Sequence, residues 1–167
     1  MKNILYLSIL FLASCASSIP DVSAPEIKPT ESDITIEDFK THIEFLSSDQ
    51  LGGRGAGTEG DKLAVSYIKK RFYDASPIKG SVEVQEHYVF KDRRQKKDKV
   101  LTYNVIGYLV GNDEKLKDEF VVVGGHYDTT ANAPGKINNG ADDNASGTSM
   151  VIAVSYTHLT LPTIYSV

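Results

Sequence analysis

The sequence predicts an α/β fold in which two amphipathic helices precede a group of strands. Apolar residues recur at helical spacing in two segments between residues 35 and 74. An uninterrupted apolar run at residues 120–123 suits an interior strand that is buried on both faces. With 167 residues, of which 41% are hydrophobic, the chain can bury one modest core, so we expect a single folded domain.

The first 15 residues are built like an export signal. Lys2 precedes an apolar stretch at residues 4–13, which is too short to cross a bilayer as a permanent helix. Its end, Leu12-Ala13-Ser14-Cys15, resembles a bacterial lipobox and implies cleavage before Cys15 and lipid attachment to that cysteine. An ordinary cleaved signal with an incidental cysteine is the alternative. We therefore expect an exported protein, lipid-anchored to a cell-envelope membrane, with its domain in the periplasm or at the cell surface.

Residues 16–34 are expected to form a disordered tether between anchor and domain. They contain three prolines, several serines and few large apolar residues. Cys15 is the only cysteine, so an internal disulfide is excluded. The net charge of −4 gives no reason to expect a nucleic-acid partner. The basic run at residues 91–99 is interrupted by Asp92 and Asp98 and lacks aromatic residues, which favours a solvated hairpin loop.

The first helix is predicted to begin after Thr35 and to end near Leu46, because Thr35 can cap it with Asp38 at the third position. Its apolar face is expected to contain Ile36, Phe39, Ile43 and Leu46. Four closely spaced glycines then predict a loop with unusual backbone angles at residues 46–60.

The second helix is predicted over residues 58–74, before Pro77 and Gly80. Its buried stripe is expected to contain Ala64, Tyr67, Ile68 and Phe72. The basic residues expected to be largely solvated are Lys62, Lys69, Lys70 and Arg71.

A pair of strands follows the second helix. Alternating residues from Val82 to Phe90, including Tyr88, are expected to share one strand face, and residues 102–110 are expected to form the partner strand. The apolar run at residues 120–123 is expected to be the interior strand described above. Chemistry in open α/β sheets tends to lie just past the carboxyl end of such a strand.

That apolar run is followed by Gly124 and Gly125 and then by His126, with Asp128 two residues later. A histidine at a strand end binds zinc well when an acceptor holds its other ring nitrogen, and Asp128 is placed on the same face to do so. A hydrogen-bonded structural histidine is the alternative. Asp142 and Asp143 follow in a glycine-flanked segment, where two adjacent carboxylates repel each other unless a cation or a proton lies between them. Either carboxylate could also cap a helix beginning near Ala145, and the two roles are compatible.

These segments resemble the co-catalytic zinc aminopeptidases, the twenty-eighth family of metallopeptidases, which include the bacterial leucyl aminopeptidases and aminopeptidase Y. The resemblance rests on GGHYDTT at residues 124–130 and NGADDNASGTS at residues 139–149, with support from residues 46–68. It spans about residues 35–154. It implies a three-layer αβα fold with a mixed, mainly parallel sheet, of the zinc-peptidase phosphorylase/hydrolase type, and peptide substrates with a free N-terminus.

The resemblance also assigns roles. It implies that His126 binds one zinc, that Asp142 bridges two zinc ions, that Asp128 is the catalytic-site residue that orients His126, and that Asp143 follows a cis peptide bond next to the metals. The family's glutamate pair, its further acidic ligand and its distal histidine would follow this segment and are not found in the chain. We therefore expect residues 35–154 to be the N-terminal part of a zinc-peptidase domain, truncated and inactive by itself.

Residues 155–167 break the helical pattern begun near Ala145, because they are rich in β-branched residues and contain Pro162. The string SYTHLTLPT resembles translated sequencing-adaptor read-through, so we expect this tail to be non-native. Two other functions remain open at this point. One is a single-zinc enzyme similar to glutaminyl cyclase, and the other is a non-catalytic surface lipoprotein with the same fold.

Overall fold

The computed structural model describes residues 35–75, 82–92, 97–111, 113–130, 132 and 135–159. The expected signal peptide, the lipidation site Cys15 and the tether lie outside these residues and stay predictions. No helix within the described ranges is both long and apolar enough to cross a membrane.

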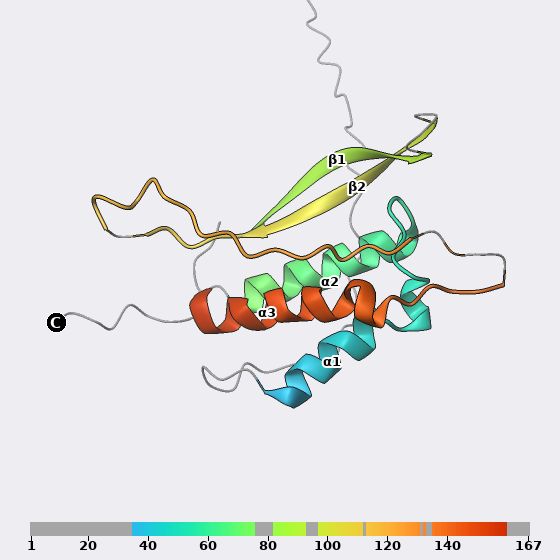
Figure 1. Ribbon diagram of the computed structural model, residues 1–167, viewed down its shortest axis with the longest axis horizontal. Helices are drawn as coiled ribbons and strands as arrows, with labels where there is room; N and C mark the ends of the chain where they lie inside the picture. The colour runs from blue at the N-terminus through green and yellow to red at the C-terminus, as the bar shows by residue number, and fades with distance from the viewer. Residues whose placement is uncertain are drawn as a thin grey trace, which may run out of the picture.

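Three helices and one hairpin form the described structure. The helices are α1 (Ile36–Leu46), α2 (Glu59–Ala75) and α3 (Ser146–Leu159), and short turns of helix precede α2 and α3 at Asp49–Leu51 and Ala141–Ala145. The hairpin pairs β1 (Val82–Asp92) with β2 (Lys97–Gly107) in antiparallel register, with Glu86 opposite Tyr103. Figure 1 shows the hairpin on one side of the helices, and the extended segment that ends at α3 running along them.

The helices share one apolar core. Its central residues come from all three helices, from the short turns before α2 and α3 and from the start of β1. They are Phe45, Leu46, Leu51, Ala64, Tyr67, Ile68, Phe72, Val82, Ala145 and Ile152. Stacking of Phe45 on Tyr67, with ring centroids 4.2 Å apart, joins α1 to α2. This core fixes the relative placement of the helices, and with them the loops that carry the candidate site.

Helix α1 has the predicted bounds and cap, since Thr35 Oγ1 accepts a hydrogen bond from the Asp38 amide at 3.1 Å. Its predicted apolar face is wrong at the start of the helix, where Ile36 is 88% exposed. The residues buried against the rest of the core are His42, Phe45 and Leu46, all in the second half of the helix. Residues of α1 are therefore buried only in the part of the helix that the other helices cover.

Helix α2 begins and ends one residue later than predicted, and its predicted apolar stripe is buried. The prediction that Arg71 is largely solvated is wrong, because the side chain is only 1% exposed. Its guanidinium lies 4.9 Å from the centre of the Tyr67 ring and 3.4 Å from an Asp74 carboxylate oxygen. These contacts stabilise its charge away from water.

The hairpin confirms the predicted strand pair, although β2 begins at Lys97 and ends at Gly107 rather than spanning residues 102–110. The predicted common face is only partly covered. Val82 is buried at the base of the hairpin, whereas Tyr88 and Phe90, nearer its turn, are exposed. A hairpin that is only two strands wide cannot shield a face along its whole length, so the aromatic side chains near the turn meet water.

The predicted interior strand at residues 120–123 does not form. The segment has no strand pairing, and Phe120, Val121 and Val122 are 87%, 96% and 86% exposed. A parallel interior strand requires neighbours on both edges. Among the described residues no other strand pairs with this segment, so its apolar side chains remain in contact with water.

Helix α3 continues to Leu159, so the expectation that the helical pattern breaks at Ser155 is wrong for these residues. The hydroxyl of Ser155 donates to the Ile152 carbonyl at 2.6 Å, and that of Thr157 donates to the Val154 carbonyl at 2.9 Å. These two hydroxyl groups thus find hydrogen-bond acceptors within the helix itself. The Tyr156 ring also stacks on His42, which holds this end of α3 against α1. The proposed foreign origin of the tail is a separate matter and stays a prediction.

The described part of the chain contains three helices and a two-stranded antiparallel sheet, and is too small to test the predicted three-layer αβα arrangement. That fold class therefore stays a prediction. What the structure does establish is the arrangement of the predicted site segments around the start of α3.

Candidate metal centre

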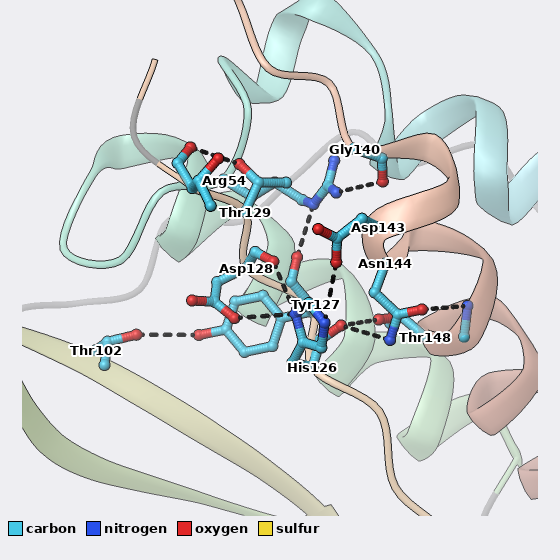
Figure 2. Close-up of polar contacts among 12 residues, drawn as sticks. Arg54, Thr102, His126, Tyr127, Asp128, Thr129, Gly140, Asp143, Asn144 and Thr148 are labelled. Carbon is cyan, nitrogen blue, oxygen red and sulfur yellow. Dashed lines mark hydrogen bonds and ion pairs between the residues drawn. The ribbon is translucent and has the colours of Figure 1, made fainter. Parts of the chain in front are cut away.

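The candidate site lies where the extended segment after Gly125 meets the start of α3 (Figure 2). The carbonyl of His126 accepts hydrogen bonds from Thr148 Oγ1 at 3.0 Å and from Asn144 Nδ2 at 3.3 Å. The amide oxygen of Asn144 accepts in turn from the Gly147 amide at 3.1 Å. These contacts fix the backbone of His126 against the first turn of α3 and leave its imidazole exposed.

The two ring nitrogens of His126 face different carboxylates. Nδ1 lies 3.0 Å from the Asp128 carbonyl oxygen and 3.4 Å from its carboxylate Oδ1, while Nε2 lies 3.2 Å from Asp143 Oδ1. A proton on Nδ1 can be donated to Asp128, which presents the Nε2 lone pair toward Asp143. Two lone pairs cannot face each other at this distance without a proton or a cation between them. The imidazole and Asp143 therefore form a pair of donor atoms suited to a metal ion.

Asp142 and Asp143 both lie in the turn at Ala141–Ala145 and are exposed. Of these two residues, Asp143 is the one whose carboxylate faces His126, whereas the backbone carbonyl of Asp142 accepts a hydrogen bond from Ser146 Oγ at 3.1 Å. The cis peptide bond lies between Asp143 and Asn144, one residue later than the resemblance implies. The backbone of Asp143 and Asn144 is also non-helical, so the turn is kinked at these two residues, directly before Ala145 and α3.

The donor types fit zinc, but the described residues supply only part of a site. Zinc is bound by histidine nitrogen and carboxylate oxygen, usually with four ligands in all. His126 supplies a nitrogen oriented by Asp128, and Asp143 or Asp142 can supply a carboxylate oxygen. Within the ranges that the structure describes, no three His, Cys, Asp or Glu side chains lie close enough to hold one ion. Further ligands have to come from elsewhere.

Tyr127 anchors the segment from its other face. Its hydroxyl donates to Asp61 Oδ1 at 2.5 Å, and it lies 3.3 Å from the Thr102 hydroxyl and 3.0 Å from the Tyr103 carbonyl oxygen. Burial, followed by the hydrogen bond to Asp61, raises the pKa of the Tyr127 hydroxyl well above its usual range. Because side chains alternate along an extended segment, Tyr127 enters the core while its neighbours His126 and Asp128 face outward.

The glycine-rich loop at residues 46–60 contacts the site segments directly. It has left-handed backbone at Gly52, Gly53, Arg54 and Gly57, as the glycine content predicts for three of them. Gly55 forms a parallel bridge with Thr129, and the Thr129 hydroxyl donates to the Gly53 carbonyl. The side chain of Asn139 donates to the Ser47 carbonyl and to Asp49 Oδ1, both at 2.7 Å. The loop thus holds the segments before and after the candidate ligands.

The sequence interpretation did not identify Arg54, Asp61 or Thr129 as site residues. All three are buried although they are polar or charged. Arg54 stands between two glycines, which adopt backbone angles that other residues rarely adopt. A charged residue in that position is a signal that the backbone turns to bring its side chain to hydrogen-bond acceptors. Asp61, by contrast, looks like an ordinary first-turn acidic residue of α2, so its burial could not be anticipated.

One comparison bears on identity. The model of a peptidase family, peptidase family M28, matches residues 104–160, a span that contains His126, Asp128, Asp142 and Asp143. No curated protein and no solved structure matches the chain significantly. Members of the matched family are typically zinc-dependent, in keeping with the donor pair described above. Over this span the chain is similar to peptidase family M28, a family of hydrolases that cleave peptide bonds.

Proposed function

We propose that the chain is the N-terminal part of a zinc aminopeptidase, which removes N-terminal residues from peptides with a site for two zinc ions. The observation that carries the proposal is the placement of His126, with Asp128 at one ring nitrogen and Asp143 at the other. An oriented imidazole beside adjacent carboxylates is an arrangement that accepts a metal ion. The fold of the complete domain is proposed to be three-layer αβα.

In this proposal His126 and Asp142 are metal ligands and Asp128 orients His126. Asp143 lies next to the metals, and its carboxylate, 3.2 Å from Nε2 of His126, is a second candidate ligand. Bound zinc ions lower the pKa of a coordinated water and polarise a peptide carbonyl, which is the chemistry that peptide hydrolysis requires. Asp128 keeps a proton on Nδ1 of His126, and so leaves Nε2 free to bind. Asp142 and Asp143 carry adjacent negative charges that repel each other, and nearby positive charge reduces this repulsion. Their presence therefore favours a site for two zinc ions over a site for one.

The missing donors must be found before the activity can be assayed. A long sequencing read across the 3′ end of the native gene, starting before the codon for Val154, shows whether the frame continues into a glutamate pair and further acidic and histidine ligands. The protein encoded by that frame is then tested for hydrolysis of leucine 4-nitroanilide, with an N-acetylated substrate as control. We expect cleavage only of the free amine substrate, loss of cleavage with a zinc chelator and recovery with zinc.

Two variants sharpen this assay. His126→Ala should abolish hydrolysis because it removes a ligand, whereas His87→Ala, on β1, should not. Two bound zinc ions per chain support the aminopeptidase. One bound zinc with cyclisation of N-terminal glutamine would instead establish the enzyme similar to glutaminyl cyclase. A native frame that lacks the glutamate pair, and yields no hydrolysis, would establish the non-catalytic surface lipoprotein.

We also propose that the protein is exported and anchored by lipid at Cys15, with its domain in the periplasm or at the cell surface. Lipid chains hold a protein at a membrane in proportion to their buried methylenes, roughly 0.8 kcal/mol for each. Labelled palmitate should enter the wild-type protein and not the variant Cys15→Ala. Equal labelling of the two proteins would contradict the anchor.

A further inference from the structure

Arg54 is a charged side chain that is completely buried, at 0% exposure. Its guanidinium donates hydrogen bonds to four backbone carbonyls. Nε donates to Tyr127 at 2.7 Å, Nη1 to Asn139 at 2.8 Å and to Leu46, and Nη2 to Gly140 at 3.0 Å. Burial lowers the pKa of the guanidinium and the nearby Asp128 opposes that shift. The hydrogen bonds of this side chain therefore hold several backbone segments in place.

Three of the four carbonyls that Arg54 binds belong to the two candidate ligand segments, and the fourth, Leu46, ends α1. Tyr127 stands between His126 and Asp128, and Gly140 stands two residues before Asp142. One planar group thus fixes the distance between a segment that carries the imidazole and a segment that carries the carboxylates (Figure 2). A lysine has no planar fork and cannot hold the same carbonyls in one geometry.

The surroundings of Arg54 leave it little freedom. A Cβ atom at Gly140 would lie 3.0 Å from Arg54 Nη2, so the glycine lets the backbone approach the guanidinium closely. On the other side of the residue, Gly53 accepts a hydrogen bond from Thr129, which follows Asp128. The loop and both ligand segments are consequently locked to one another around this side chain.

We propose that Arg54 is a positioning residue of the metal centre, which sets the spacing between His126 and the carboxylates of Asp142 and Asp143. The inference rests on the proposed metal centre and deepens it, because neither the matched family span nor the predicted ligands include Arg54. Arg54 touches no metal ligand side chain through its donors. It acts through the backbone on either side of the site.

The test compares Arg54→Met, Arg54→Lys and a matched control, Arg71→Met. Arg71 is a buried arginine of α2 whose guanidinium stacks on Tyr67, so its loss perturbs the core without touching the site segments. The first readout needs no metal. It is the nuclear Overhauser contact between the His126 imidazole and the Asp143 methylene in the 167-residue chain. We expect the contact in wild type and Arg71→Met, its loss in Arg54→Met, and a weakened contact in Arg54→Lys.

The second readout is zinc binding, followed through the imidazole nitrogens of His126 during titration with the metal alone. Loss of a residue that orients ligands typically weakens metal binding by about 10- to 100-fold, and we expect that loss in Arg54→Met but at most about 2-fold in Arg71→Met. Partial recovery in Arg54→Lys is expected because a cation remains. Unchanged binding in Arg54→Met, or equal losses in Arg54→Met and Arg71→Met, would overturn the positioning role.

The two readouts separate two kinds of failure. If zinc leaves His126 unaffected in the wild-type chain but the metal-free contact is lost only in Arg54→Met, then Arg54 positions these residues, and the residues of this chain do not bind zinc by themselves. If the contact survives in Arg54→Met, the positioning role is wrong whatever zinc does. If Arg54→Met does not fold, Arg54→Lys gives the answer. A His126–Asp143 contact of wild-type intensity in folded Arg54→Lys would also overturn the positioning role.

Discussion

The hydroxyl of Tyr127 donates to the carboxylate of Asp61 at 2.5 Å, across 66 residues of sequence. Asp61 is fully buried, and its other carboxylate oxygen accepts from the Gly57 amide at 2.7 Å. The pair therefore joins the residue between His126 and Asp128 to the first turn of α2. A buried carboxylate whose oxygens both accept hydrogen bonds is stabilised without a neighbouring cation.

Tyr127→Phe should destabilise the protein because it leaves Asp61 Oδ1 without its donor. An unsatisfied buried partner costs about 1–3 kcal/mol, toward the upper end when it is charged. Urea unfolding followed by circular dichroism measures the loss. Tyr88→Phe is the matched control, since Tyr88 is exposed and keeps its ring beneath Lys99. Equal free energies of unfolding for the two variants would contradict the importance of this hydrogen bond.

His42 should make stability depend on pH. Burial, with Arg71 nearby, lowers the pKa of His42 from 6.5 to about 4, and Asp38 opposes the shift. Its Nδ1 lies 2.7 Å from the Tyr67 hydroxyl. The unfolded chain takes up a proton below pH 6.5 whereas the folded chain does so only near pH 4, so stability is full above pH 6.5 and falls as pH drops toward 4.

The expected loss from His42 is about 2 kcal/mol between pH 7 and pH 5. It is measured as the change in free energy of urea unfolding. His42→Gln should remove this part of the pH dependence, and His87→Gln on β1 should keep it. A wild-type pH dependence that survives in His42→Gln would show that other groups cause it.

Gly60→Ala should destabilise the protein even though alanine favours helix by roughly 1 kcal/mol over glycine. A Cβ atom at Gly60, in the first turn of α2, would collide with the Leu51 carbonyl, whose carbon lies at 2.7 Å. The clash is with backbone, which cannot move aside cheaply, so we expect a net loss of about 1–3 kcal/mol. Thermal unfolding measures it, with Glu59→Ala as an exposed neighbour for comparison. A rise in melting temperature for Gly60→Ala would show that the loop yields.

The exposed apolar segment at residues 120–123 should promote association of the chain, because its unpaired backbone N–H and C=O groups can pair with another chain and its apolar side chains can be buried there. Val121→Lys should reduce aggregation without loss of helix, since Val121 is 96% exposed. Light scattering during concentration and far-ultraviolet circular dichroism test this. Ile36→Lys makes the same change of charge at a residue that is 88% exposed on α1. If it reduces aggregation equally, net charge and not the segment is responsible.

Local patterns predicted the local structure well. The cap at Thr35, the bounds of α2 within one residue and the existence of the hairpin all depend on neighbouring residues, and all are confirmed. The failures at Ile36, Arg71 and residues 120–123 have one cause. In each case burial depends on which element covers the side chain, and that information is distant in the sequence.

The candidate site shows the same division. The positions of His126 and Asp128 on one face followed from strand geometry, and their proximity is found in the structure. The choice of Asp143 over Asp142 as the partner of His126 depends on the kinked turn before α3, which spacing alone does not specify. Arg54 and Asp61 act over 66 to 86 residues of sequence, so no local pattern could reveal their contacts with the site.

The hydrogen bonds from Arg54 to Tyr127, Asn139 and Gly140 close chain loops of 73, 85 and 86 residues. Closing loops of that size costs conformational entropy before the contacts repay it, and proteins that rely on such contacts fold more slowly. The candidate ligands therefore reach their final spacing late in folding, after α1, the glycine-rich loop and the start of α3 have met. A nascent chain carries His126 and Asp143 with no fixed relation between them, and so has no preformed candidate metal centre before the N-terminal loop has docked.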